Sequence, residues 1–116
     1  MCSVTSHGSA YGRFGHAIER RNVWAAEMAM REMGDVTLAD ALDYVELLAE
    51  SRLDRFERAA VRWHGRLAVE AGIMTLRESQ LILAALADLP SGDAKTKAML
   101  RDLLRRVKPG PLRPMR

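Results

Sequence analysis

The sequence feature that most constrains this chain is a regular apolar stripe between residues 53 and 71. Apolar side chains recur there every three or four residues over five turns, at Leu53, Phe56, Ala60, Trp63, Leu67 and Ala71. This spacing is the period of an α-helix with one buried face. Such a helix has to pack on other elements, so we expect its neighbours along the chain to be helices that cover this face.

The segment before the stripe predicts a second amphipathic helix, which begins at Thr37. Thr37 and Asp40 have the spacing of a capping box. The side of this helix opposite its apolar face carries four carboxylates, Asp40, Asp43, Glu46 and Glu50. We expect them to form a solvated face. A turn at about residues 51–54, with Ser51 or Asp54 as the cap of the next helix, makes the two helices an antiparallel hairpin.

A second hairpin is predicted for the segment after Gly72. Thr75 and Glu78 form a complete capping box, and the run LILAALADL that follows is apolar nearly all round. We therefore expect this helix to be the most buried of the chain. Pro90 and Gly92 end it, and a last helix extends from about residue 94 to Val107. Segments 37–50 and 75–88 align at an offset of 38 residues, which weakly resembles stacked tetratricopeptide-like hairpins.

The N-terminal part predicts a flexible arm followed by one packing helix. Residues 1–16 are rich in Ser and Gly, and a helix is expected over residues 17–33, with Asn22 as an alternative, inner start. Its methionines are an apolar stripe for core packing, or else an adaptable binding surface. We thus predict an all-α fold of about five helices, with two hairpins and an N-terminal packing helix. The domain limits are 1–16 for the arm, 17–107 for a single helical domain, and 108–116 for a basic, Pro-rich tail.

Length and cysteine content narrow the class of protein. A chain of 116 residues with 48% hydrophobic residues is enough for one globular domain. Cys2 is the only cysteine, so no disulfide can form within the chain. The start of the sequence lacks the layout of a signal peptide, and no apolar run reaches the length of a membrane span. We therefore expect a cytoplasmic protein.

A row of arginines on the long helix is the first candidate binding surface. Arg55, Arg58, Arg62 and Arg66 fall on an arc about 120° from the centre of the apolar stripe, at ~100° per residue. Such an arc can be neutralised by carboxylates of a neighbouring helix or left open for a partner. Our leading hypothesis is a non-enzymatic interaction module that uses this arc to bind a protein partner.

Charge is distributed unevenly and supports an alternative hypothesis. Residues 1–93 hold 10 Lys/Arg against 14 Asp/Glu, whereas residues 94–116 hold 8 Lys/Arg against one Asp. The candidates for phosphate contacts are the cations of the last helix and tail, Lys95, Lys97, Arg101, Arg105, Arg106 and Lys108. Such cations bind nucleic acid without reading its sequence. They equally stabilise a helix C-terminus and keep a protein in solution.

No motif of an enzyme stands out. His64 is the one histidine inside a well-predicted helix, and a catalytic role would need a nucleophile and an orienting carboxylate near it. Cys2, His7 and His16 lack the spacing of a metal site. Phosphate-binding loops and dinucleotide fingerprints are missing from the sequence. We therefore expect neither catalysis nor a cofactor. Gly65, inside the same helix, suggests a close crossing by another helix.

Four blocks of the chain have counterparts in a known group of proteins. They are WAAEMAMREMG (Trp24 to Gly34), DALDYVELLAE (Asp40 to Glu50), ERAAVRWHGRL (Glu57 to Leu67) and ESQLILAALADLP (Glu78 to Pro90). They resemble segments of short all-helical actinobacterial proteins of unknown function, over about residues 20–107. The resemblance implies a folded bacterial domain, and it implies no activity, ligand or functional residue.

Overall fold

A computed structural model of the chain describes residues 9–107. Within this range the protein forms six α-helices, one short 3-10 turn and no β-strand. The elements are α2 (Ala10–Glu19), α3 (Val23–Met33), α4 (Leu38–Ser51), α5 (Leu53–Ala71), α6 (Leu76–Asp88), η1 (Leu89–Ser91) and α7 (Ala94–Val107). The predicted all-α class is confirmed. The number of helices is six rather than about five.

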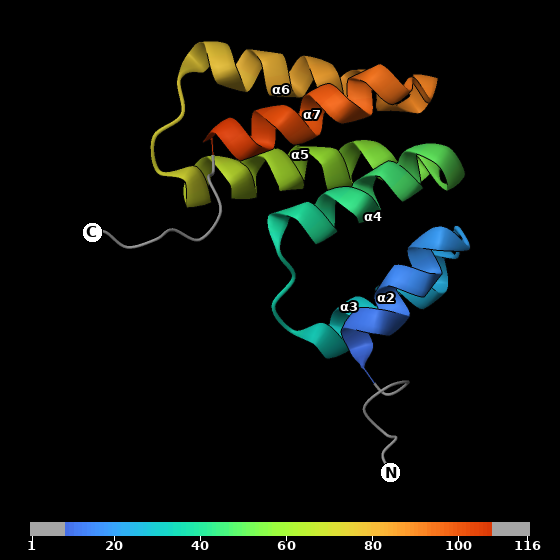
Figure 1. The fold of residues 1–116 in the computed structure, drawn as a ribbon. Coiled ribbons are helices and arrows are strands. Elements are labelled where there is room, and N and C mark those ends of the chain that lie inside the picture. Colours follow the sequence, from blue (N-terminus) through green and yellow to red (C-terminus); the bar gives the residue numbers. More distant parts are fainter. Residues whose placement is uncertain (1–8, 108–116) are drawn as a thin grey trace.

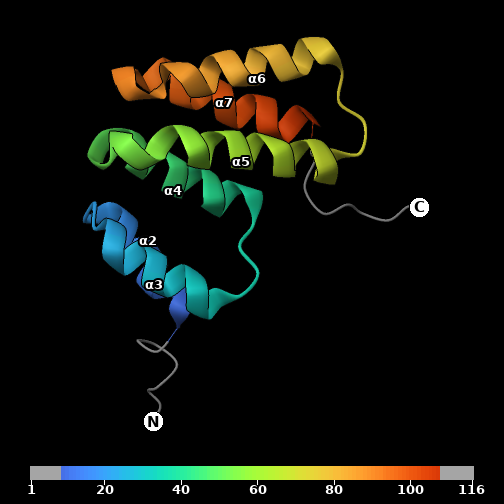
Figure 2. The same ribbon diagram turned by 180° about the vertical axis from the view of Figure 1, so that it is seen from behind.

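The helices are arranged as three successive pairs. In both views α4 and α5 occupy the middle of the molecule, with α6 and α7 on one side and the α2/α3 pair on the other (Figures 1 and 2). The shortest dimension of the molecule is 22 Å, about two helix diameters. Each helix therefore has one side on a neighbour and another near solvent.

Two hydrophobic cores hold these pairs together. The larger core is formed by buried side chains of α4, α5, α6, η1 and α7, among them Leu42, Trp63 and Leu100. The smaller core joins α2 and α3 to Leu47 of α4. Helix α4 is thus the element that contributes buried side chains to both. Trp63 also donates its indole N–H to the carbonyl of Leu38, at 2.9 Å, and so fixes α5 to the first turn of α4.

The predicted helix starts at Thr37 and Thr75 are confirmed. The Thr37 hydroxyl accepts a hydrogen bond from the backbone N–H of Asp40. Thr75 accepts one from Glu78, whose carboxylate in turn accepts one from the N–H of Thr75. These contacts satisfy backbone donors that a helix N-terminus leaves without partners. They set the register in which the apolar sides of α4 and α6 face the larger core.

The flexible arm expected over residues 1–16 is wrong for its second half. Residues 10–16 belong to α2, whose N-cap Ser9 accepts a hydrogen bond from the backbone N–H of Gly12 at 3.1 Å. Phe14 and Ala17 are buried in the smaller core, and this burial stabilises the helix despite two glycines. Residues 1–8 lie outside the described range.

The single helix expected over residues 17–33 is also wrong, because the chain turns sharply at Arg21. Arg21 has a φ of 56°, in the left-handed region that interrupts a helix. Asn22 then caps α3 by accepting a hydrogen bond from the N–H of Ala25, at 3.0 Å. The inner start at Asn22 is therefore the one that the protein uses. The turn folds α2 back along α3.

The turn between α4 and α5 differs from the expectation as well. Arg52 is the N-cap of α5, and neither Ser51 nor Asp54 caps it. The side chain of Leu53, the first member of the apolar stripe, is 62% exposed. The rest of the stripe packs as predicted, from Phe56 to Leu67. Leu53 stands next to the turn between α4 and α5 and borders a hollow between α5 and α6 instead of the core.

Helix α6 is not the most buried helix. Leu81 and Leu83 are 45% and 41% exposed, and Leu76 is more exposed still. Only Ile82, Ala85 and Leu86 are buried in this helix. The helix lies at the edge of the bundle (Figure 1), so neighbours cover only one side of a largely apolar segment. Composition alone does not reveal this position.

The cap at Asn22 gives a first testable prediction. Replacing Asn22 by Ala removes the acceptor for the Ala25 N–H and should lower the free energy of unfolding by about 1 kcal/mol. Asn22→Asp keeps an acceptor and should cost only a few tenths of that, roughly 0.3 kcal/mol. Urea unfolding followed by circular dichroism measures both values. Equal losses in the two variants would contradict a capping role.

Candidate functional site

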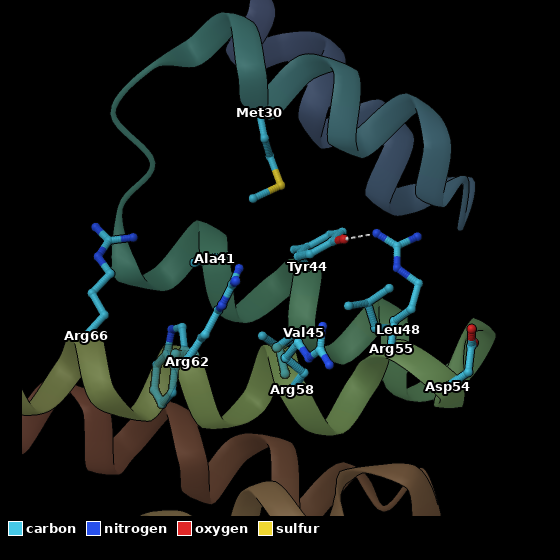
Figure 3. Close-up of a pocket in the computed structure, with 12 residues that line it drawn as sticks. Met30, Ala41, Tyr44, Val45, Leu48, Asp54, Arg55, Arg58, Arg62 and Arg66 are labelled. Atoms are coloured by element: carbon cyan, nitrogen blue, oxygen red, sulfur yellow. Dashed lines mark hydrogen bonds between the residues drawn. The ribbon is translucent and has the colours of Figure 1, made fainter.

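A groove of about 610 Å³ lies between α3 and the α4/α5 pair. All four arginines of the predicted arc line it, on the α5 side. Apolar atoms of Met30 on α3, Ala41 and Tyr44 on α4, and Ala59 on α5 complete its walls. Figure 3 shows Met30 extending from α3 toward the space above α4 and α5. The groove thus combines a cationic wall with apolar ones, and its lining includes one carboxylate, Asp54, which pairs with Arg52.

The two outer arginines are bound to groups of the protein. Arg55 forms an ion pair with Glu27 of α3 and donates a hydrogen bond to the Tyr44 hydroxyl at 3.1 Å. Arg66 donates to the carbonyl of Val36 and forms an ion pair with Glu70. These contacts connect α5 to α3 at one end of the arc and to the loop before α4 at the other. They neutralise the outer part of the arginine arc.

The contact at the first end also shifts two pKa values. Burial opposes the ionisation of Glu27, but hydrogen bonds from Tyr44 and Arg55 outweigh it and lower the pKa of this carboxyl. Burial and the Glu27 carboxylate together raise the pKa of Tyr44 to about 12. At neutral pH the Tyr44 hydroxyl is therefore a neutral donor to an ionised Glu27, and Arg55 holds both groups in place.

The two inner arginines have no such partners. Arg58 and Arg62 are exposed, and neither makes an ion pair or hydrogen bond with any residue in the described range 9–107. They are four residues apart on one helix, so both face the same groove. Figure 3 shows Arg62 extending from α5 toward Ala41. Half of the predicted arc is thus internally paired, and half is open.

Met30 and Tyr44 are groove residues that the arginine pattern does not identify. The sequence left the methionines of α3 open between a core stripe and an adaptable surface. Met30 is half-buried and borders both the smaller core and the groove. Periodicity places it on the inner side of α3, but only the packing of α3 on α4 reveals what faces it.

The predicted solvated acidic face of α4 is wrong at most of its positions. Arg101 of α7 forms ion pairs with Asp43 and Glu46, the latter at 3.1 Å, and donates to the Ala39 carbonyl. Lys97 pairs with Glu50 at 3.0 Å. Helix α7 therefore covers this side of α4. Two of the nucleic-acid candidates, Lys97 and Arg101, are used inside the fold.

The other nucleic-acid candidates divide into three. Arg105 and Arg106 both pair with Asp102 of their own helix, at 3.4 and 2.9 Å, and remain largely exposed. Lys95 is exposed at the start of α7. Lys108 lies outside the described residues, as does the rest of the tail. The cations that remain accessible for phosphate contacts in α7 are thus fewer than the charge count predicts.

Glu46 is the α4 carboxylate that has a buried oxygen without a partner. Only 14% of its side chain is exposed, and its Oε2 has no hydrogen-bond partner. Burial raises the pKa of Glu46, although Arg101 acts in the opposite direction. Burying the charged form of this side chain therefore lowers the stability of the fold, and the ion pair with Arg101 only partly offsets this loss.

His64 forms a contact between two helices, α5 and α6. Its Nε2 is 2.7 Å from the Ser79 hydroxyl of α6, and the imidazole is half-buried. No carboxylate within the described range hydrogen-bonds to the ring, and neither residue lines the groove. Gly65 beside it is open to solvent on its Cβ side, so the predicted close helix crossing there is wrong.

A second hollow of about 460 Å³ lies between α5 and α6. Its walls are mainly apolar and include Leu53, Val61 and Leu83, with Glu57 as a charged member. Elsewhere in residues 9–107, no three His, Cys, Asp or Glu side chains form a group able to hold a metal ion. None of the helices in this range has the length and apolar character needed to cross a membrane.

Comparisons with known proteins do not add a function. No family model, no curated protein and no solved structure matches this chain. The resemblance to short actinobacterial proteins therefore stays a prediction.

The Arg101 cluster gives a second prediction. Arg101→Met removes the ion-pair partner of both Asp43 and the largely buried Glu46, and should lower the free energy of unfolding by about 2–4 kcal/mol. Arg105→Met, the control on the same helix, removes an exposed pair and should cost no more than about 0.5 kcal/mol. Urea unfolding at pH 7 measures both. Similar losses would contradict the structural role given to Arg101.

Glu46 gives a third prediction, on the pH dependence of stability. A carboxyl whose pKa is higher in the folded protein than in the unfolded chain binds protons more readily when folded, so stability falls as pH rises through that range. Glu46→Gln removes this contribution. The stability of the variant relative to the wild type should therefore increase from pH 4 toward pH 7. Urea titrations across this range measure the difference, and a constant or decreasing value contradicts it.

Proposed function

We propose that this protein is a non-enzymatic helical module that binds an acidic segment of a partner protein in the arginine groove. The observation that carries this proposal is the contrast within the arc. Arg55 and Arg66 are neutralised by the protein itself, whereas Arg58 and Arg62 between them are not. Two uncompensated cations at one groove favour an anionic ligand.

The chemistry of the groove suits carboxylates. A guanidinium can donate two parallel hydrogen bonds to a carboxylate, which gives both strength and orientation. Exposed ion pairs contribute little to binding, but pairs that are partly removed from water are stronger. The apolar walls formed by Met30 and Ala41 supply this partial shielding.

We assign the acidic segment to another molecule. Acidic side chains are missing from residues 1–8 and 108–116, which lie outside the described range. Within residues 9–107, no carboxylate pairs with Arg58 or Arg62.

The fold type and the cellular location that we propose are those expected from the sequence. The packing of α4 on α5 and of α6 on α7 supports a two-hairpin, tetratricopeptide-like arrangement, a type of fold that presents binding grooves. We keep the cytoplasm of a bacterium as the proposed location. The alternative function is nucleic-acid binding through α7 and the tail, favoured by the exposure of Arg105 and Arg106.

A matched pair of charge reversals tests the proposal. The groove variant carries Arg58→Glu and Arg62→Glu, and the α7 variant carries Arg105→Glu and Arg106→Glu. Both variants change the net charge by the same amount, but at different places. The probe is a fluorescein-labelled octapeptide in which Glu alternates with Ser, measured by fluorescence polarisation. The groove variant should lose at least about tenfold in affinity, because each reversal replaces attraction by repulsion. The α7 variant should stay within about threefold of the wild type.

The same pair of variants separates the alternative function. Labelled duplex DNA at low salt is the second probe, with circular dichroism as the check that both variants remain helical. Peptide binding that disappears only in the α7 variant would contradict the groove. DNA binding that disappears only in the α7 variant, without any peptide binding by the wild type, would replace the proposal by the nucleic-acid alternative.

A further inference from the structure

We infer that the groove selects a short extended motif in which one apolar residue stands between two acidic residues. This inference rests on the proposed function and specifies its ligand. It depends on three properties of the groove, namely its length, the spacing of its free cations, and the position of its apolar walls.

The length of the groove limits the ligand to a few residues. Arg55 and Arg66 mark its ends on α5, and eleven residues of helix correspond to about 16 Å. Their contacts with Glu27 and with the Val36 carbonyl cross the space at each end. Figure 3 shows Arg55 and Arg66 on either side of the inner arginines. An extended peptide of about five residues covers that length.

The spacing of the free cations matches an extended segment. Four residues of helix separate Arg58 from Arg62, which corresponds to about 6 Å along the axis of α5. In an extended peptide, residues i and i+2 lie on the same side, about 6.6 Å apart. Acidic residues at these two positions would each face one arginine.

The residue between them then points away from α5. The walls on that side come from α3 and α4 and present Met30, Ala41 and the Tyr44 ring, all half-buried. Met30 is flexible and polarizable, and adapts to apolar side chains of different shape. A leucine-sized residue at position i+1 would therefore bury apolar surface on Met30 and Ala41. The motif is acidic–apolar–acidic.

Three pentapeptides of related composition test this motif by fluorescence polarisation. They are Ser-Glu-Leu-Glu-Ser, the leucine-free Ser-Glu-Ser-Glu-Ser, and the rearranged Ser-Leu-Glu-Glu-Ser. The first should bind roughly tenfold tighter than the second, because it buries a leucine side chain. The third places its carboxylates on opposite sides and should bind no tighter than the second.

Two variants of α3 locate the apolar contact. Met30→Ala should reduce the advantage of the leucine peptide to less than about threefold and leave the leucine-free peptide unchanged. Met28→Ala is the control, because Met28 lies on the same helix, is 37% exposed and does not line the groove. Thermal unfolding of both variants identifies any loss of fold. If the folded Met30→Ala protein still binds the leucine peptide roughly tenfold tighter than the leucine-free one, the leucine does not contact Met30 and this placement is overturned.

The outcomes distinguish the inference from the proposed function. If the three peptides bind equally and all lose affinity in the Arg58→Glu, Arg62→Glu variant, the acidic-partner proposal stands and the motif fails. If neither the pentapeptides nor the alternating octapeptide binds, both fail. Sedimentation equilibrium adds a further outcome. A dimer that dissociates in the charge-reversed variant means that a second copy of this chain fills the groove, which overturns the motif.

Discussion

The packing of α4 against four other helices, α2, α3, α5 and α7, is the constraint on which this structure depends. One side of α4 gives Leu42, Val45 and Leu48 to the larger core, and another gives Leu47 to the smaller one. Its carboxylates are held by Arg101 of α7. The Trp63 indole fixes its first turn to α5. Neighbours contact this helix on several sides, so any shift of α4 would disturb both cores and the groove together.

Charge pairing then decides which surface is available for binding. Helix α7 carries more cations than the arginine arc of α5, but its Lys97 and Arg101 form ion pairs that attach α7 to α4. On α5 only the outer arginines of the arc are paired. Arg58 and Arg62 line the groove without a charged partner in the described part of the chain. A count of charges along the sequence favours the C-terminus, whereas the folded arrangement favours the middle of α5. The difference arises from tertiary contacts between residues 47 to 58 positions apart, Lys97 with Glu50 and Arg101 with Asp43 and Glu46.

The sequence predicts local structure well, but it predicts poorly which side chains of different helices contact one another. The caps at Thr37 and Thr75 and most of the apolar stripe of α5 are visible in the sequence, because each depends on residues within a few positions of one another. The break at Arg21 is less visible, since its left-handed conformation is carried by a residue that rarely adopts it. The arc of arginines could be predicted, but its division into paired and open members could not. That division depends on Glu27 and Val36, which α3 and its loop bring close to α5.

The attachment of the smaller core has a consequence for how the molecule opens. The α2/α3 pair is joined to the rest mainly through Leu47, the half-buried Val23 and Tyr44, and the ion pairs Glu27–Arg55 and Arg21–Glu50. Such a unit can unfold locally at a lower free energy than the four-helix remainder. Since α3 is one wall of the groove, its opening also removes the binding site. A ligand in the groove would therefore oppose this opening, and the order of the N-terminal helices and the occupancy of the groove are linked as a single equilibrium.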